Sequence, residues 1–125
     1  MNLDIGTLTS QGESLLEDFT KKMGLDGALI ATSEGLEMAS FFNSNKEADA
    51  IAADVASILS VINGGLLINT QSGALKDMII SAENGSIAIK DLGEDIALGI
   101  VAPEGYKMGV LAVALKKFVT ELQAL

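Results

Sequence analysis

The sequence MGLDGALIATSEGLEMAS, Met23–Ser40, contains a helix end and two strand-like runs in close succession. Gly24 is a natural stop for a helix that precedes it. The apolar run Ala28–Thr32 predicts a short strand, and the residues after it, Ser33–Gly35, supply turn chemistry because glycine accepts a positive φ. A second strand is predicted over Leu36–Phe42. A turn this short makes the two strands antiparallel neighbours.

The segment before this hairpin has helical periodicity. We expect the helix to begin near Ser10, because Ser10 and Glu13 have the spacing of a capping box. Residues that repeat at helical spacing form its apolar stripe, and these are Leu15, Leu16, Phe19 and Met23.

A second helix, predicted over Glu47–Ile62, is apolar on more than one side. One stripe consists of Ile51, Val55, Ile58 and Ile62, and another of Ala48, Ala52, Ala56 and Leu59. A helix with two apolar sides is usually covered on both, and one sheet can cover only one of them. The pattern therefore predicts a partner subunit on the other side. At Asn63–Gly65 we expect the helix to end in a turn; a cradle for an anion is the less favoured alternative.

Three short strands and a last helix follow. The strands are predicted over Met78–Ala82, Ser86–Leu92 and Ile96–Val101, with hairpin turns between them. In the last strand, Ala97, Gly99 and Val101 share a face of small residues that would let a helix approach closely. Pro103 ends this strand. The last helix is predicted over Tyr106–Leu122, with a buried stripe of Met108, Leu111, Leu115, Phe118 and Leu122.

The order α-β-β-α-β-β-β-α indicates an α/β (α+β) fold with an antiparallel sheet, and the length of 125 residues predicts one domain over residues 1–125. Six apolar residues from these elements are expected to be mostly buried: Phe19, Leu29, Leu98, Leu111, Leu115 and Phe118. Met78–Ala82 is a plausible edge strand that needs cover. The predicted surface of a two-fold dimer combines it with the second helix, through Ile51, Val55, Ile58, Ile62, Met78 and Ile80.

Composition limits the possible partners. The net charge is −9, and all eight basic residues are lysines. Nucleic acid is an improbable partner because it requires a dense basic surface. The uncharged stretch Val55–Ala74 is interrupted by polar residues and glycines, so we expect no membrane insertion. The absence of cysteine and of a signal pattern predicts a cytoplasmic protein without disulfides.

The sequence offers little material for catalysis. It has no His and no Cys, so nucleophile–histidine pairs are impossible. Asp49 and Asp54 could be imagined as metal ligands, but a solvated helix face is the better interpretation. Paired acids such as Glu34/Glu37 and Glu94/Asp95 lie beside turns, where carboxylates are ordinary surface residues. We expect a protein that is not an enzyme and holds no cofactor or metal.

The first hairpin resembles that of the roadblock family of dynein light chains. That family has a Gly-x-x-Gly-x-x-x-x-(Ser/Thr/Asp)-x-(Glu/Asp)-Gly-Leu pattern, and Gly24–Leu36 is similar to it. Other regions agree in order and spacing: the alanine-rich second helix, the Glu83–Gly85 and Gly93–Asp95 turns, and the start of the last helix at Tyr106–Gly109. The resemblance covers about residues 8 to 123.

The resemblance implies a profilin-like, five-stranded antiparallel sheet with helices on both faces: the second helix on one and the terminal helices on the other. It implies a homodimer in which the second helix and the third strand pair across a two-fold axis. It also implies a regulator or scaffold that binds a Ras-like small GTPase, with no catalytic residues of its own. The alternative is a sensory or adaptor module, which a discrete apolar pocket with convergent polar groups would favour.

Overall fold

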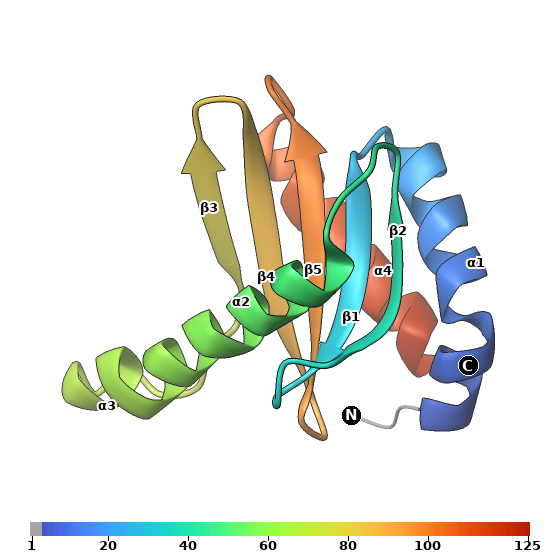
Figure 1. Cartoon of the computed structure of the whole chain (residues 1–125). Coiled ribbons are helices and arrows are strands. Elements are labelled where there is room, and N and C mark those ends of the chain that lie inside the picture. Colours follow the sequence, from blue (N-terminus) through green and yellow to red (C-terminus); the bar gives the residue numbers. More distant parts are fainter. Residues whose placement is uncertain (1–3) are drawn as a thin grey trace.

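The computed structural model describes residues 4–125 and has one antiparallel sheet with helices on both faces (Figure 1). The strands lie in the order β2-β1-β5-β4-β3. The predicted element order and fold class are confirmed. The elements are α1 Ile5–Met23, β1 Gly27–Thr32, β2 Glu37–Phe42, α2 Ala48–Val61, the π-helical turn η1 Ile62–Leu66, α3 Leu67–Asn69, β3 Met78–Ala82, β4 Gly85–Gly93, β5 Ile96–Pro103 and α4 Met108–Gln123.

The first hairpin has the predicted form. Helix α1 stops at Gly24, which takes the left-handed conformation at φ 67°. The turn between β1 and β2 closes with the amide of Gly35 donating to the Thr32 carbonyl at 3.0 Å, and Gly35 has φ 91°. Because β1 pairs with both β2 and β5, this hairpin joins the N-terminal strands to the centre of the sheet.

One face of the sheet is closed by α1 and α4 together. The rings of Phe19 and Phe118 stack across the two helices with centroids 4.1 Å apart. The hydroxyl of Tyr106 donates to the Met23 carbonyl at 2.7 Å and so ties the end of α1 to the segment before α4. All six residues predicted for the core are buried: Phe19, Leu29, Leu98, Leu111, Leu115 and Phe118.

Of the described elements, only α2 lies on the other face of the sheet (Figure 1). The alternation predicted for β5 is correct: Leu98 and Ile100 face α1 and α4, while Ala97 and Gly99 face α2. A Cβ added at Gly99 would lie 3.5 Å from a methyl carbon of Val55, so the helix does rest directly on small residues.

Two predicted details of the terminal helices are wrong. Helix α1 begins at Ile5 and not near Ser10, because the side chain of Asp4 accepts a hydrogen bond from the Thr7 amide at 3.2 Å and caps the helix one turn and a half earlier. This hydrogen bond also lowers the pKa of Asp4. In α4, Met108 is not part of the buried stripe: it is 41% exposed, since the helix begins there, beyond the packed core.

Candidate interaction surface

The second helix does not end where the glycines predicted. After Val61 the chain passes through the π-helical turn Ile62–Leu66 and one more helical turn, so the helical segment runs from Ala48 to Asn69. Gly64 and Gly65 stay helical, and the positive φ values that break the helix occur later, at Gln71 and Gly73. The predicted turn at Asn63–Gly65 is therefore wrong.

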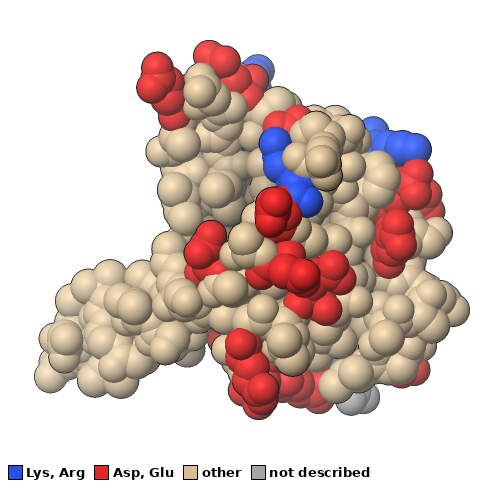
Figure 2. Space-filling view, in the orientation of Figure 1, with Lys and Arg blue, Asp and Glu red and all other residues tan. Residues whose placement is uncertain are grey.

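This longer helix projects past the edge of the sheet (Figure 1). Three large apolar side chains on the projecting part are open to solvent: Val61 is 67%, Leu66 54% and Ile68 65% exposed. The projecting lobe carries no Lys, Arg, Asp or Glu, as its uniform tan surface in Figure 2 shows. Exposed apolar surface of this kind is typical of interaction sites.

An apolar groove lies between α2 and the sheet. From the helix, Ile51, Val55 and Ile58 line it, and from the strands Ile80, Ile87 and Ile89 do so. Its volume is about 330 Å³. The groove is open because α2 crosses the sheet over β1 and β5 and diverges from β3. The apolar face of β3 is therefore left without a helix above it (Figure 1).

The structure brings most of the predicted dimer residues together. Four of them, Ile51, Val55, Ile58 and Ile80, line the groove, and Met78 packs in the same apolar cluster. Ile62 lies apart from the groove, in the π-helical turn. Whether these residues meet a partner stays a prediction.

Sequence reasoning missed other members of this surface. The exposed Val61, Leu66 and Ile68 were not assigned because the helix was expected to stop before most of them. The unbroken uncharged run from Val55 to Leu75 was the available signal. Ile87 could have been found from its alternation with Ile89 on the same face of β4.

The same helical segment has the length and composition of a membrane span. Over Ala48–Asn69 the most apolar window has a mean hydropathy of 1.9, and only 17% of that window is buried within the described structure. However, Ala52, Val55 and Leu59 are buried against the sheet. The helix could enter a bilayer only by leaving the sheet and exposing the apolar residues beneath it.

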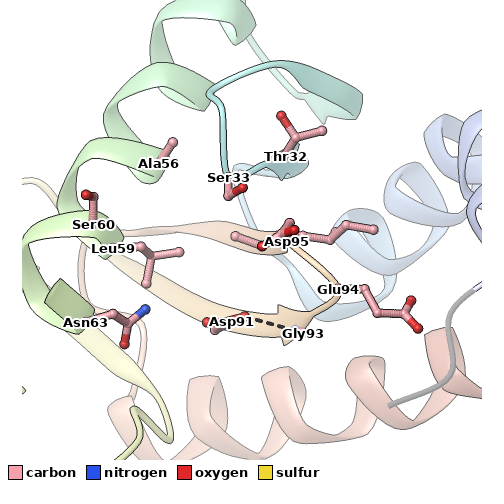
Figure 3. Close-up of a pocket in the computed structure, with 12 residues that line it drawn as sticks. Thr32, Ser33, Ala56, Leu59, Ser60, Asn63, Asp91, Gly93, Glu94 and Asp95 are labelled. Carbon is pink, nitrogen blue, oxygen red and sulfur yellow. Dashed lines mark hydrogen bonds between the residues drawn. The ribbon is translucent and has the colours of Figure 1, made fainter.

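A second, more polar hollow lies on the other side of α2 (Figure 3). It has a volume of about 350 Å³ and is lined by hydroxyl, amide and carboxylate groups of α2 and of two hairpin turns: Thr32, Ser33, Ser60, Asn63, Asp91, Glu94 and Asp95. The Asp91 carboxylate accepts a hydrogen bond from the Gly93 amide at 2.9 Å, which fixes it within its own turn.

The acids of this polar hollow do not converge. Figure 3 shows the Glu94 side chain directed away from Asp91. Glu94 and Asp95 both have positive φ, at 55° and 62°, because together they form the tight β4–β5 turn. Across residues 4–125 no group of three His, Cys, Asp or Glu side chains is placed to hold a metal ion.

Comparisons with known proteins agree with the fold. A family model for the Roadblock/LC7 domain matches residues 11–102. The chain belongs to the Roadblock/LC7 domain family. A comparison with curated protein sequences found no match.

Several solved structures have the same fold at low sequence identity. MglB of Myxococcus xanthus superposes with a TM-score of 0.82 at 16% identity, over 92% of this chain and 94% of that one. The gliding protein MglB of Thermus thermophilus gives 0.79 at 18% identity, over 98% and 93%. A structure described as MglB with a tetrameric arrangement gives 0.81 at 18% identity, over 98% and 93%. At these identities the likeness shows a shared fold.

Proposed function

We propose that this Roadblock/LC7 protein is a non-catalytic, cytoplasmic homodimer that regulates or scaffolds a Ras-like small GTPase. The observation that carries the proposal is the apolar surface of α2 and β3, which the rest of the chain leaves uncovered. Family membership supports the same reading, because the resemblance implies pairing of this helix and this strand across a two-fold axis.

The edge of the sheet supports a dimer independently. Within residues 4–125, strand β3 pairs only with β4, so in this part of the chain its outer edge presents unpaired backbone groups. Exposed edges are normally protected by charges, proline or bulges, and the sequence of β3, MIISA, contains none of these. A two-fold copy would pair β3 with itself and extend the sheet, while the two α2 helices would cover each other's open side.

The same arrangement accounts for the hydropathy of α2 without a membrane. A second copy would cover Ile58 and Val61 while Ala52 and Val55 stay packed on the sheet. A bilayer would cover the outer side only at the expense of the sheet packing. We therefore propose a partner subunit and not a lipid phase as the cover of this helix.

The GTPase mechanism is limited by composition. Some activators of GTPases insert an arginine finger, and this chain contains no arginine. A lysine can offer charge but not the bidentate fork of a guanidinium. Any stimulation of hydrolysis would therefore work by holding the switch loops of the GTPase in their ordered state.

Eight single Lys→Ala variants test this mechanism against a lysine finger. The assay measures complex formation and GTP hydrolysis with nucleotide-loaded Ras-like GTPases recovered from native lysate. We expect each variant to keep the stimulation that the unmodified protein shows. Loss of stimulation in one variant with binding intact would replace the positioning mechanism by a lysine finger. If no Ras-like GTPase binds the protein in either nucleotide state, the proposed function is overturned.

The alternative of a ligand-binding module has one observation in its favour. The apolar groove has a volume at the lower end of the range of small-molecule sites. Its only charged lining residues are Lys46 and Asp54, and hydrogen-bonding side chains that would orient a ligand are otherwise missing from its lining. The groove also lies where the second copy would pack, so the dimer is the better-supported occupant.

A further inference from the structure

The face of the sheet that α1 and α4 cover has an uncovered strip over β3. In Figure 1 both helices lie behind the sheet, toward β1, β2, β4 and β5, and neither runs behind β3. The side chain of Ile79 points to this face and is only half-buried. Helices on a sheet are about 10 Å apart and strands about 4.8 Å, so two helices cover about four strands and leave the fifth open.

A hollow of about 510 Å³ lies on the outer side of α4, where Lys76 and Asp77, just before β3, and Lys90 of β4 form its other wall, and it is larger than the two hollows beside α2. Its helical wall is a stripe at helical spacing, Ala112, Lys116, Thr120 and Gln123, with Val113 beside it. Val113 is 66% exposed, so this wall combines an open apolar side chain with a positive charge.

Charge separates this hollow from the rest of the surface. Three of the eight lysines of the chain, Lys76, Lys90 and Lys116, line it against one acid, Asp77. Within the described residues only Lys21 and Glu17 form an ion pair, so no carboxylate oxygen lies within 4.0 Å of the ammonium groups of the three lysines. The ammonium of Lys90 donates to the Lys76 carbonyl, which holds it at the rim. A local excess of positive charge therefore stands out on a chain of net charge −9.

We propose that this hollow, the lysine groove, binds an acidic amphipathic helix of a partner protein. The apolar face of that helix would pack on Val113 and Val119, which line the groove, and its flanking carboxylates would meet Lys76, Lys90 and Lys116. The lysine groove lies on the opposite face of the sheet from α2 and shares no lining residue with the apolar groove.

The probe is a fluorescein-labelled peptide of about 16 residues, with leucines at positions i, i+3, i+4 and i+7 and glutamates on both flanks. Fluorescence anisotropy measures its binding to the full chain. The control peptide has lysine in place of every glutamate. We expect the acidic peptide to bind and the basic peptide not to bind. Binding should weaken between about 0.1 M and 1 M salt, where the Debye length falls from about 10 Å to 3 Å.

Two lysines adjacent in sequence provide the matched variants. Lys116 lines the lysine groove, whereas Lys117 lines a small hollow between α4 and α1. We expect Lys116→Glu to weaken the acidic peptide about fivefold or more, because an attraction becomes a repulsion, and Lys117→Glu to change it less than about twofold. Thermal unfolding of both variants checks that the fold is intact.

Equal effects of the two variants, or binding of both peptides alike, would overturn the proposal. No binding by the unmodified protein would overturn it too. Competition by inorganic phosphate at concentrations that leave the ionic strength unchanged would show a site for small anions, and that outcome also counts against the helix. Failure of the proposed dimer or GTPase binding would leave these results unaffected, because the probe needs neither.

Discussion

The two faces of the sheet are built from similar apolar residues but differ in how completely they are covered. On one face α1 and α4 bury a continuous core that includes the stacked rings of Phe19 and Phe118. On the other face, the buried residues of α2 itself are Ala52, Val55 and Leu59. Comparable apolar side chains of the same helical segment, such as Val61 and Ile68, are exposed to solvent. Hydrophobicity alone therefore does not distinguish a covered face from an open one in this chain. The number of helices available to each face does.

The largest expected effect is on the open face. Replacing Ile58 with Glu places a carboxylate in the apolar groove, and a two-fold interface would bury two such groups, each costing several kcal/mol. We expect the dimer dissociation constant to rise by about a thousandfold or more. Analytical ultracentrifugation over a range of concentrations measures this change.

The matched control for this variant is Val113→Glu. It puts the same charge on an exposed valine of α4, away from the proposed dimer surface, and should leave the dimer intact. A well-folded monomer for the unmodified protein at micromolar concentration would refute the proposed dimer.

On the closed face we expect Leu115→Ala to lower the free energy of unfolding by about 2–5 kcal/mol, because a fully packed leucine leaves a cavity. Denaturant unfolding at a fixed protein concentration measures it, since the stability of a dimer depends on concentration. Val113→Ala on the exposed side of the same helix is the control and should stay within about 0.5 kcal/mol. A loss below about 1 kcal/mol at Leu115 would mean that α4 does not close this face.

Replacing a glycine with alanine should change the free energy of unfolding in opposite directions on the two faces. A Cβ at Gly12 of α1 would meet the Cβ of Ala39 at 2.6 Å, so Gly12→Ala should destabilise the protein by about 1–3 kcal/mol. Gly64, in the projecting helical segment, has nothing within 4 Å of the added atom. Gly64→Ala should stabilise the protein by up to about 1 kcal/mol through helix propensity. Equal destabilisation by both, in the same unfolding assay, would contradict the contrast.

The smallest effect is expected at the tie between the terminal helices. Tyr106→Phe removes the hydrogen bond to the Met23 carbonyl and should cost about 0.5–1.5 kcal/mol. Burial raises the pKa of Tyr106 above its usual value near 10, so the unfolded chain ionises first and stability should fall as pH rises through that range. Tyr106→Phe should therefore lose the part of the fall in stability at high pH that comes from ionisation of Tyr106. An unchanged profile between about pH 9 and 11 would show that the hydroxyl does not contribute.

The order and pairing of the elements were predictable from the sequence because they follow from local signals. The turn at Ser33–Gly35, the Asn84-Gly85 hairpin and the alternation along β5 each specify a neighbour within a few residues. The burial of Phe118 and Leu115 followed from a helical stripe with one apolar side. Predictions were confirmed where the signal lay within a few residues and the apolar residues were on one side of the helix or strand.

The errors occurred where two local signals competed. Ser10 and Glu13 have capping-box spacing, but the earlier Asp4 also caps, and burial of Leu8 stabilises the extra turns of α1. At Asn63–Gly65 the glycines suggested a stop, but glycine permits a positive φ without requiring it, and the helix continues. The lysine groove was invisible for a different reason: Lys76, Lys90 and Lys116 lie on three segments, and no spacing in the sequence brings them together.

The position of α1 and α4 on the same face of the sheet also determines where a tag or reporter domain would lie. Both described ends of the chain, at Asp4 and Leu125, are on the side of the sheet that α1 and α4 cover, and so far from the open face of α2 (Figure 1). A reporter domain or an immobilisation tag joined at either end would therefore sit behind the sheet. A chip-bound molecule attached in this way would present α2 and β3 to the solution, with the proposed binding surface oriented by the position of the two termini.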